Sequence, residues 1–189
     1  PHPRKPHALA WYAVDPADDV WLVAALQVDG EPATVRARVD ELEHDHRLGT
    51  VKRLMDPNMG ASPSGGRRGV TVRDEFDAAG LRCDLADDNR DTARSRLREM
   101  LKPDSRTRAP RFRVFRTCPV TNMHFGKYTW AEWSRYSSDK RDPKPIPMEK
   151  WDDYPTLAGY LMNAGPPTFA GLRMGGERMV RPGTRRGGY

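Results

Sequence analysis

The sequence predicts a mixed α/β domain, because an opening pair of strand-like runs is followed by an alternation of helix-like and strand-like segments. The runs 8–14 and 20–26 are short, apolar and rich in β-branched and aromatic residues, and the turn-forming segment 15–19 separates them. This arrangement is typical of a β-hairpin. A hairpin followed by strand–helix alternation indicates a mixed sheet flanked by helices.

The first helix is expected at residues 34–48. Thr34 is a suitable N-cap, and the apolar side chains that follow it recur at i, i+4 and i+7, which places them on one buried stripe. These side chains are Val35, Val39 and Leu42.

A strand is expected at 51–58 and ends near Asp56, followed by a Gly and Ser-rich loop at 60–69. Thr71 then begins a helix, since Asp74 stands three residues later, as in a capping box. Gly80 is the expected C-terminal glycine of that helix.

The second half of the chain continues the alternation. We expect two strands and three helices there, the strands at 81–86 and 111–118 and the helices at 90–101, from Pro119 onward and at 151–163. Residues 1–165 would form the folded domain, and the Gly, Pro and Arg-rich residues 166–189 would form a basic, flexible C-terminal tail.

Composition limits the class of protein. The chain has 189 residues, 37% of them hydrophobic, which suits one domain with a modest core. No apolar run reaches a membrane span, and the first residues do not resemble a signal peptide, so an intracellular setting is expected. Cys83 and Cys118 lack CxxC spacing and are expected to be reduced core thiols.

The charge points to a polyanionic partner. The net charge is +6, yet residues 1–50 hold 5 Lys and Arg against 9 Asp and Glu, and the remainder holds 27 against 17. A basic surplus confined to one part of a chain favours nucleic acid. The alternative is an arginine-rich composition without spatial clustering.

Asp56 is the first candidate site residue. It lies at the carboxyl end of a predicted strand, where ligand sites of open α/β sheets gather, and its oxygens suit a divalent cation. The alternative is that Asp56 and Pro57 only initiate a turn, which is a common use of this pair.

Asp152 and Asp153 begin the last predicted helix. Acids in a first helical turn often serve only as caps that complement the helix dipole. With Asp56 as partner, however, they would supply the several carboxylates that two-metal phosphodiester cleavage needs around Mg²⁺ or Mn²⁺ ions about 4 Å apart.

Three cations are candidates for contact with DNA. Arg67 and Arg68 follow glycines in the loop 64–69, which permits close approach to phosphates, although the segment could equally be a flexible surface loop. Lys150, two residues before the acid pair, could neutralise a phosphate. No Walker A pattern is present, so no ATP site is expected, and the five histidines form no zinc cluster.

In this order, the segments resemble the C-terminal nuclease domain of the large subunit of viral DNA-packaging terminases. The resemblance rests on MDPN, TVRDEFDAAGL, DLADDNRD, RFRVFRTCP, NMHFGKYTW and PMEKWDDYPTLAGY, and it covers about residues 1–165. In the last of these segments, Asp152, Asp153 and Tyr160 match the late acidic motif of the family. The opening segment PHPRKPHALAWYAV is also similar to the start of the family's domain.

The resemblance implies a ribonuclease H-like fold and a metal-dependent endonuclease that cuts concatemeric double-stranded DNA in the host cytoplasm. Asp56 and Asp153 would bind Mg²⁺ or Mn²⁺, with Asp152 in reserve. The implied partners are a terminase ATPase domain, a portal protein and a small terminase subunit.

Three departures from the family pattern accompany the resemblance, one of which is that these 189 residues hold no ATPase portion. The family's first catalytic Asp and its strand would precede Pro1, and the later Asp of the closing motif is Thr156 here. Asp153, three residues earlier on the same helical face, could take over that role. These departures leave open a non-catalytic DNA-binding or motor-assembly module, and more weakly another nuclease such as a resolvase.

Overall fold

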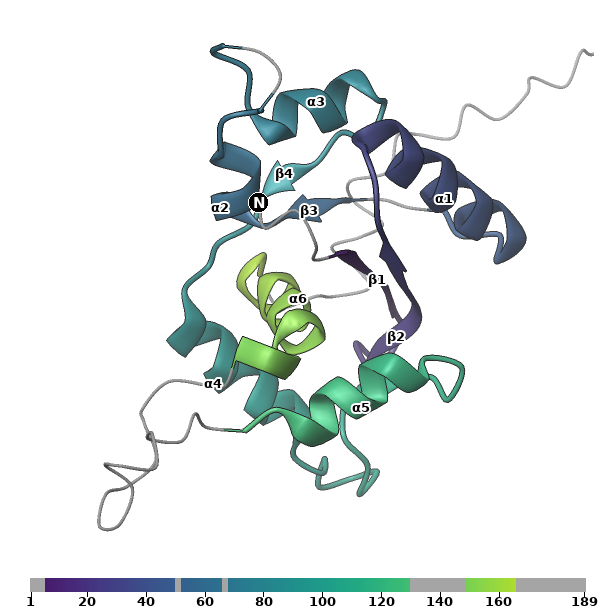
Figure 1. Cartoon of the computed structure of the whole chain (residues 1–189). Helices are drawn as coiled ribbons and strands as arrows, with labels where there is room; N and C mark the ends of the chain where they lie inside the picture. Colours follow the sequence, from purple (N-terminus) through teal and green to yellow (C-terminus); the bar gives the residue numbers. More distant parts are fainter. Residues whose placement is uncertain (1–5, 50–51, 66–67, 130–148, 166–189) are drawn as a thin grey trace, which may run out of the picture.

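The computed structural model of the chain describes residues 6–49, 52–65, 68–129 and 149–165. Its elements follow one another in an alternating order (Figure 1). They are β1 (His7–Val14), β2 (Val20–Val28), α1 (Pro32–Asp45), β3 (Leu54–Met55), α2 (Pro57–Ala61), α3 (Val72–Ala78), β4 (Asp84–Leu85), α4 (Arg90–Leu101), β5 (Phe112–Val114), α5 (Pro119–Lys127), the 3₁₀ turn η2 (Glu149–Trp151) and α6 (Asp153–Asn163).

The larger sheet has the order β1-β2-β5. Strands β1 and β2 are antiparallel and pair from His7 with Val28 to Val14 with Val20, with a bulge between Trp11 and Tyr12. Strand β5 lies parallel to β2. The predicted hairpin is therefore confirmed, and the described residues form a mixed α/β fold with a three-stranded mixed sheet.

A second sheet pairs β3 with β4 in parallel, joining Leu54 to Asp84 and Met55 to Leu85. The strand expected at 51–58 is shorter than predicted, because helix α2 begins at Pro57. Proline suits the first turn of a helix, where its missing N–H costs nothing, so the chain turns from strand to helix at Asp56.

The predicted N-terminal cap is confirmed for α3 and is wrong for α1. The capping box of α3 is confirmed, with Thr71 and Asp74 bonded reciprocally, and Gly80 follows the helix with φ +84°, a left-handed conformation that favours glycine. Helix α1, by contrast, starts at Pro32 after Glu31 and not at Thr34, because proline at the helix start sets the entry conformation.

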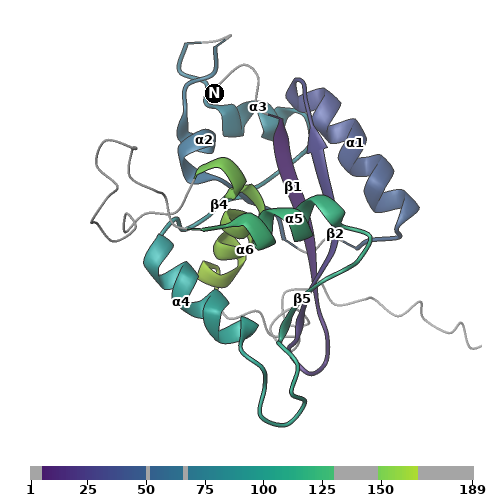
Figure 2. The same ribbon diagram turned by 60° about the horizontal axis from the view of Figure 1, so that its bottom comes forward.

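Helices cover both faces of the larger sheet (Figures 1 and 2). On one side, α1 and α3 pack on the strands through a buried cluster of apolar side chains, namely Val28, Val35, Val39, Met55, Val72, Phe76 and Leu81. On the other side, α4 and α6 contribute to a second cluster, made of Val20, Leu97, Phe112, Ala158 and Met162. Because the first cluster includes Met55 of β3, it also fixes the small sheet against the large one.

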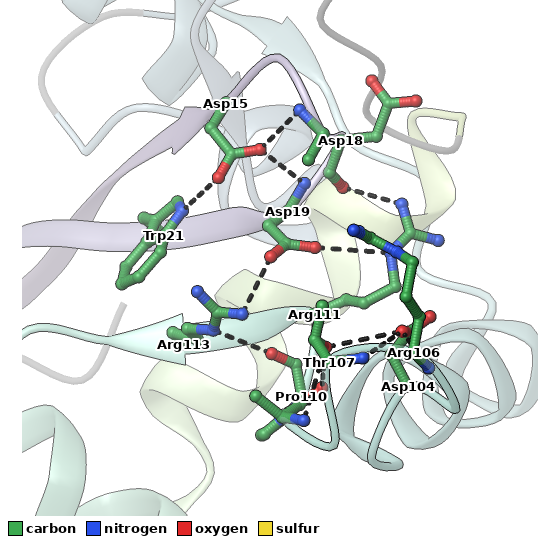
Figure 3. A network of polar contacts seen from close by, with 12 residues as sticks. Asp15, Asp18, Asp19, Trp21, Asp104, Arg106, Thr107, Pro110, Arg111 and Arg113 are labelled. Carbon is green, nitrogen blue, oxygen red and sulfur yellow. Dashed lines mark hydrogen bonds and ion pairs between the residues drawn. The ribbon is translucent and has the colours of Figure 1, made fainter.

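The hairpin turn is bonded to β5 by charged side chains (Figure 3). Asp15 accepts a hydrogen bond from the Trp21 indole at 3.0 Å, and Asp19 pairs with Arg113 at 2.9 Å. Arg111 donates to the backbone oxygen of Asp18 at 3.0 Å. The contacts of Arg111 and Arg113 join segments more than 90 residues apart, so they fix the short strand β5 beside β2, whereas the Asp15–Trp21 bond lies within the hairpin.

Among the described residues, no helix is long and apolar enough to cross a membrane. Cys118 is buried and Cys83 half-buried, both as free thiols, and burial raises the pKa of each. The predicted tail 166–189 and most of the Pro and Lys-rich connection 134–150 lie outside the described residues.

Candidate functional site

Asp56 lies at the carboxyl end of β3 and is the N-cap of α2. Its Oδ1 atom accepts hydrogen bonds from the backbone N–H groups of Asn58 at 2.8 Å and Met59 at 2.9 Å. An N-cap aspartate stabilises a helix start in this way. Asp56 therefore has both features that were considered from the sequence. It lies at the end of a strand, and with Pro57 it also begins a turn.

The second oxygen of Asp56 connects the strand end to helix α6. Tyr160 donates its hydroxyl to Asp56 Oδ2 at 2.6 Å, and the Tyr160 side chain is buried. Burial first, and then the hydrogen bond to the carboxylate, raise the pKa of Tyr160 well above its ordinary value. At neutral pH the phenol is therefore protonated and acts as the donor.

Asp88 lies close to Asp56 on the loop that follows β4. The Asn58 side chain donates to Asp88 Oδ2 at 3.3 Å. At the other end of the loop, Asn163 of α6 donates to the backbone oxygens of Asp87 and Asn89, both at 3.0 Å. Because β3 and β4 are parallel, the acids that follow them meet at the same edge of the sheet.

These segments surround a hollow of about 80 Å³ between α4, α6 and the loop after β4. We call it the carboxylate hollow. It is lined by Asp87, Asp88, Arg90, Ala93, Arg94, Leu97, Tyr128, Asp152, Pro155, Thr156, Gly159, Tyr160 and Asn163. A volume of this size holds a few water molecules or a hydrated ion, since one water needs roughly 10–15 Å³. Asp56 is not part of this lining, but its Oδ2 atom is hydrogen-bonded to Tyr160, which is.

The two acids of the closing motif point to different surroundings. Asp152 lines the carboxylate hollow beside Thr156. Asp153 lies next to α5, with its Oδ2 atom 3.9 Å from Nδ1 of the buried His124. The structure therefore brings Asp152, and not Asp153, into the group that contains Tyr160 and Asp88.

Of the three predicted phosphate contacts, the two that the structure describes, Arg68 and Lys150, do not line this hollow. Arg67 lies outside the described residues. Arg68 is exposed in the turn before α3, and Lys150 lies over the Trp151 ring, 5.1 Å from its centroid. The cations that do line the hollow are Arg90 and Arg94 of α4.

Asp88 and these two arginines were not predicted as site residues. A signal for Asp88 was present in the segment DLADDNRD, whose acids follow a predicted strand just as Asp56 does. The arginines carry a weaker signal, because an arginine on an amphipathic helix most often belongs to a solvated face. Only the packing of α4 against α6 places Arg90 and Arg94 beside the acids.

Carboxylate oxygens are the ligands that Mg²⁺ and Mn²⁺ prefer, so the donor chemistry around the hollow fits a hard divalent cation. The spacing is looser than in a completed metal centre. In the described ranges no three His, Cys, Asp or Glu side chains converge on one metal position, and both Asp56 oxygens accept hydrogen bonds. Asp88 and Asp152 are candidate ligands because both line the hollow.

Comparisons with known proteins do not assign the chain to a family. No protein-family model, no curated protein and no solved structure matches it.

Proposed function

We propose that this chain is the ribonuclease H-like nuclease domain of a viral DNA-packaging terminase and that it hydrolyses phosphodiester bonds in double-stranded DNA. The observation that carries the proposal is the Tyr160–Asp56 hydrogen bond of 2.6 Å. It joins the acid at the end of β3 to the helix that begins with Asp152, beside the acidic loop of Asp88. Acids from two separate segments, represented by Asp88 and Asp152, line the hollow, and Tyr160 links Asp56 of a third segment to it.

In this proposal the residues have distinct roles. Asp88 and Asp152 would hold Mg²⁺ or Mn²⁺, with Asp56 as a third ligand from the strand end. When bound, such cations activate water and stabilise the leaving oxygen. Tyr160 orients the Asp56 carboxylate, and Arg90 and Arg94 meet the phosphate that enters the hollow. The ATPase domain, portal protein and small subunit named by the family resemblance remain proposed partners.

A plasmid-nicking assay with Mn²⁺ tests the proposal. Asp56→Asn is preferable to Asp56→Ala, because asparagine keeps an oxygen that can cap α2. We expect the parent chain to convert supercoiled plasmid to nicked circles, and Asp56→Asn and Asp88→Asn to reduce the rate by about a hundredfold or more. Asp84→Asn, which changes an exposed acid on β4, is the matched control.

Equal nicking by the parent chain and Asp56→Asn would contradict the role of Asp56. The looser spacing of the acids gives specific support to a second function, a DNA-binding module without catalysis. That function predicts salt-sensitive DNA binding and no nicking by any variant at any Mn²⁺ concentration.

A further inference from the structure

A row of four cations runs along α4. Arg90, Arg94, Arg98 and the C-cap residue Lys102 follow one another at intervals of four residues, so each is a neighbour of the one about a turn before it. Ala93 and Leu97 lie on the buried side of α4. We call these four residues the basic row.

The basic row begins at the carboxylate hollow and leads away from it. Arg90 and Arg94 line that hollow. Arg94 also lines a second, open hollow with Asp91, Ser95, Arg98, Glu99 and Lys102. One side chain therefore belongs to both hollows, and the cations form a continuous surface along α4.

The acids in the row do not cancel its charge. Asp91 lies 3.6 Å from Arg94, with 93% of the Asp91 side chain exposed. Glu99 pairs with Lys102 at 2.5 Å, and both side chains are about two-thirds exposed. An ion pair with both side chains exposed, such as Glu99–Lys102, contributes about 0–1 kcal/mol, so a phosphate can replace Glu99 at little cost. In the second hollow, three cations (Arg94, Arg98 and Lys102) against two acids leave a positive surplus.

We propose that the basic row binds the phosphate backbone of double-stranded DNA and guides it along α4 to the carboxylate hollow. With a rise of 1.5 Å per residue, the row spans roughly 18 Å in steps of about 6 Å. Double-stranded DNA carries one negative charge per roughly 1.7 Å of helix axis, so a row of this length lies opposite several phosphates. Arginine in addition binds phosphate through two parallel N–H groups. This inference deepens the proposed function, on which the direction towards the hollow rests.

The test measures binding of a labelled 20-bp duplex by the full chain in EDTA, so that neither metal nor cleavage contributes. The variant is Arg98→Gln/Lys102→Gln, because glutamine removes both charges while keeping helix propensity similar. The matched control is Arg38→Gln/Arg47→Gln, which removes two exposed charges on and just after α1, on the opposite side of the sheet. The basic tail is the same in every protein.

We expect the row variant to bind roughly tenfold or more weakly at 0.1 M salt and to lower the slope of log K against log salt by about two. The control should keep the parental slope. The proposal would be overturned if the row variant bound the duplex like the parent chain, or if the row variant and the control lost affinity equally. So would displacement of the duplex by polyglutamate as effectively as by unlabelled DNA at equal charge, because the row would then recognise an acidic polypeptide equally well.

The two proposals fail separately. Absence of nicking with Mn²⁺ together with a reduced slope for the row variant would reject the nuclease and leave the basic row in place. Nicking that depends on Asp56, together with an unchanged slope, would reject the basic row and leave the nuclease.

Discussion

Tyr160 and Asp56 stand 104 residues apart in the chain, and a hydrogen bond of 2.6 Å joins the Tyr160 hydroxyl to the Asp56 carboxylate. The same carboxylate caps α2 through its other oxygen. One side chain thus fixes the strand-to-helix turn after β3 and anchors α6 to it. The bond therefore couples the position of α6 to that of the acid at the end of β3.

Tyr160→Phe removes the hydroxyl and retains the ring. We expect it to lower the free energy of unfolding by about 1–2 kcal/mol, because a hydrogen bond to a charged acceptor is lost at a buried position. Urea denaturation at pH 7 measures the change. Tyr154→Phe is the control, since the Tyr154 hydroxyl makes only a long 3.4 Å contact with the Leu26 backbone oxygen. A loss in the control as large as in Tyr160→Phe would contradict the special role of the Asp56 bond.

Stability should fall in alkali because of buried phenols. Burial, followed by the nearby Asp153 charge, raises the pKa of Tyr154 to about 12, and Tyr160 is also raised. A folded-state pKa above the unfolded value of about 10 gives stability that is fully present below pH 10 and is lost as pH rises towards the folded value. Each such tyrosine contributes a slope of about 1.4 kcal/mol per pH unit.

The measurement is the free energy of unfolding between pH 8 and pH 12. Tyr154→Phe should show a shallower decline above pH 10 than the parent chain, while its stability at pH 8 changes little. A decline of the same steepness in the two proteins would show that folding does not raise the pKa of Tyr154.

The hairpin turn should carry an acid-sensitive contribution. The hydrogen bond from the Trp21 indole, more than the turn's backbone N–H groups, lowers the pKa of Asp15. A lowered folded-state pKa gives stability that is present above the unfolded value of about 4 and is lost as pH falls through the folded value. Asp15→Asn should therefore narrow the difference in urea midpoint between pH 7 and pH 3. The matched control is Asp91→Asn, and a narrowing of equal size there would refute the assignment.

Close packing of α4 against α6 sets the shape of the carboxylate hollow. A Cβ atom placed on Gly159 would lie 3.1 Å from Ala93 Cβ, a rigid atom on the neighbouring helix. We expect Gly159→Val to lower the free energy of unfolding by about 1–3 kcal/mol through overpacking. Ala93→Gly should offset part of that loss in a double-mutant cycle. Strict additivity of the two changes would contradict the contact.

Much of the fold could be predicted because its signals are local. The hairpin, the capping box at Thr71 and the helix at 90–101 depend on side chains within a few residues of one another. The short strand β3 was overestimated, since apolar residues before Asp56 look the same in a strand of two residues as in one of eight. Here Pro57 decided the boundary.

The site was predicted less completely, because its assembly depends on packing. Asp56 and Asp152 carried a local signal, whereas the direction of Asp153 is set by helix α5, where the buried His124 lies beside it. Successive residues of a helix point about 100° apart, so only one acid of the pair can face the hollow. Which one does so follows from the orientation of α6, and the sequence carries no direct signal for that.

Asp152 and Asp153 have different surroundings, so a metal-binding experiment can distinguish them without measuring catalysis. We expect Asp88→Asn and Asp152→Asn each to weaken Mn²⁺ binding about tenfold or more, since loss of even a supporting group at a metal site has effects of that size. Asp153→Asn and Asp84→Asn should bind Mn²⁺ like the parent chain.

Isothermal titration with Mn²⁺ measures the affinity directly. Thermal unfolding supplies a second readout, because bound ligand stabilises the fold by about 2.7 kcal/mol at a hundredfold excess over Kd. If Asp153→Asn were the variant that lost Mn²⁺ and Asp152→Asn kept it, the acid beside His124 would be the ligand, and α6 would have to turn by about 100° when the cation binds.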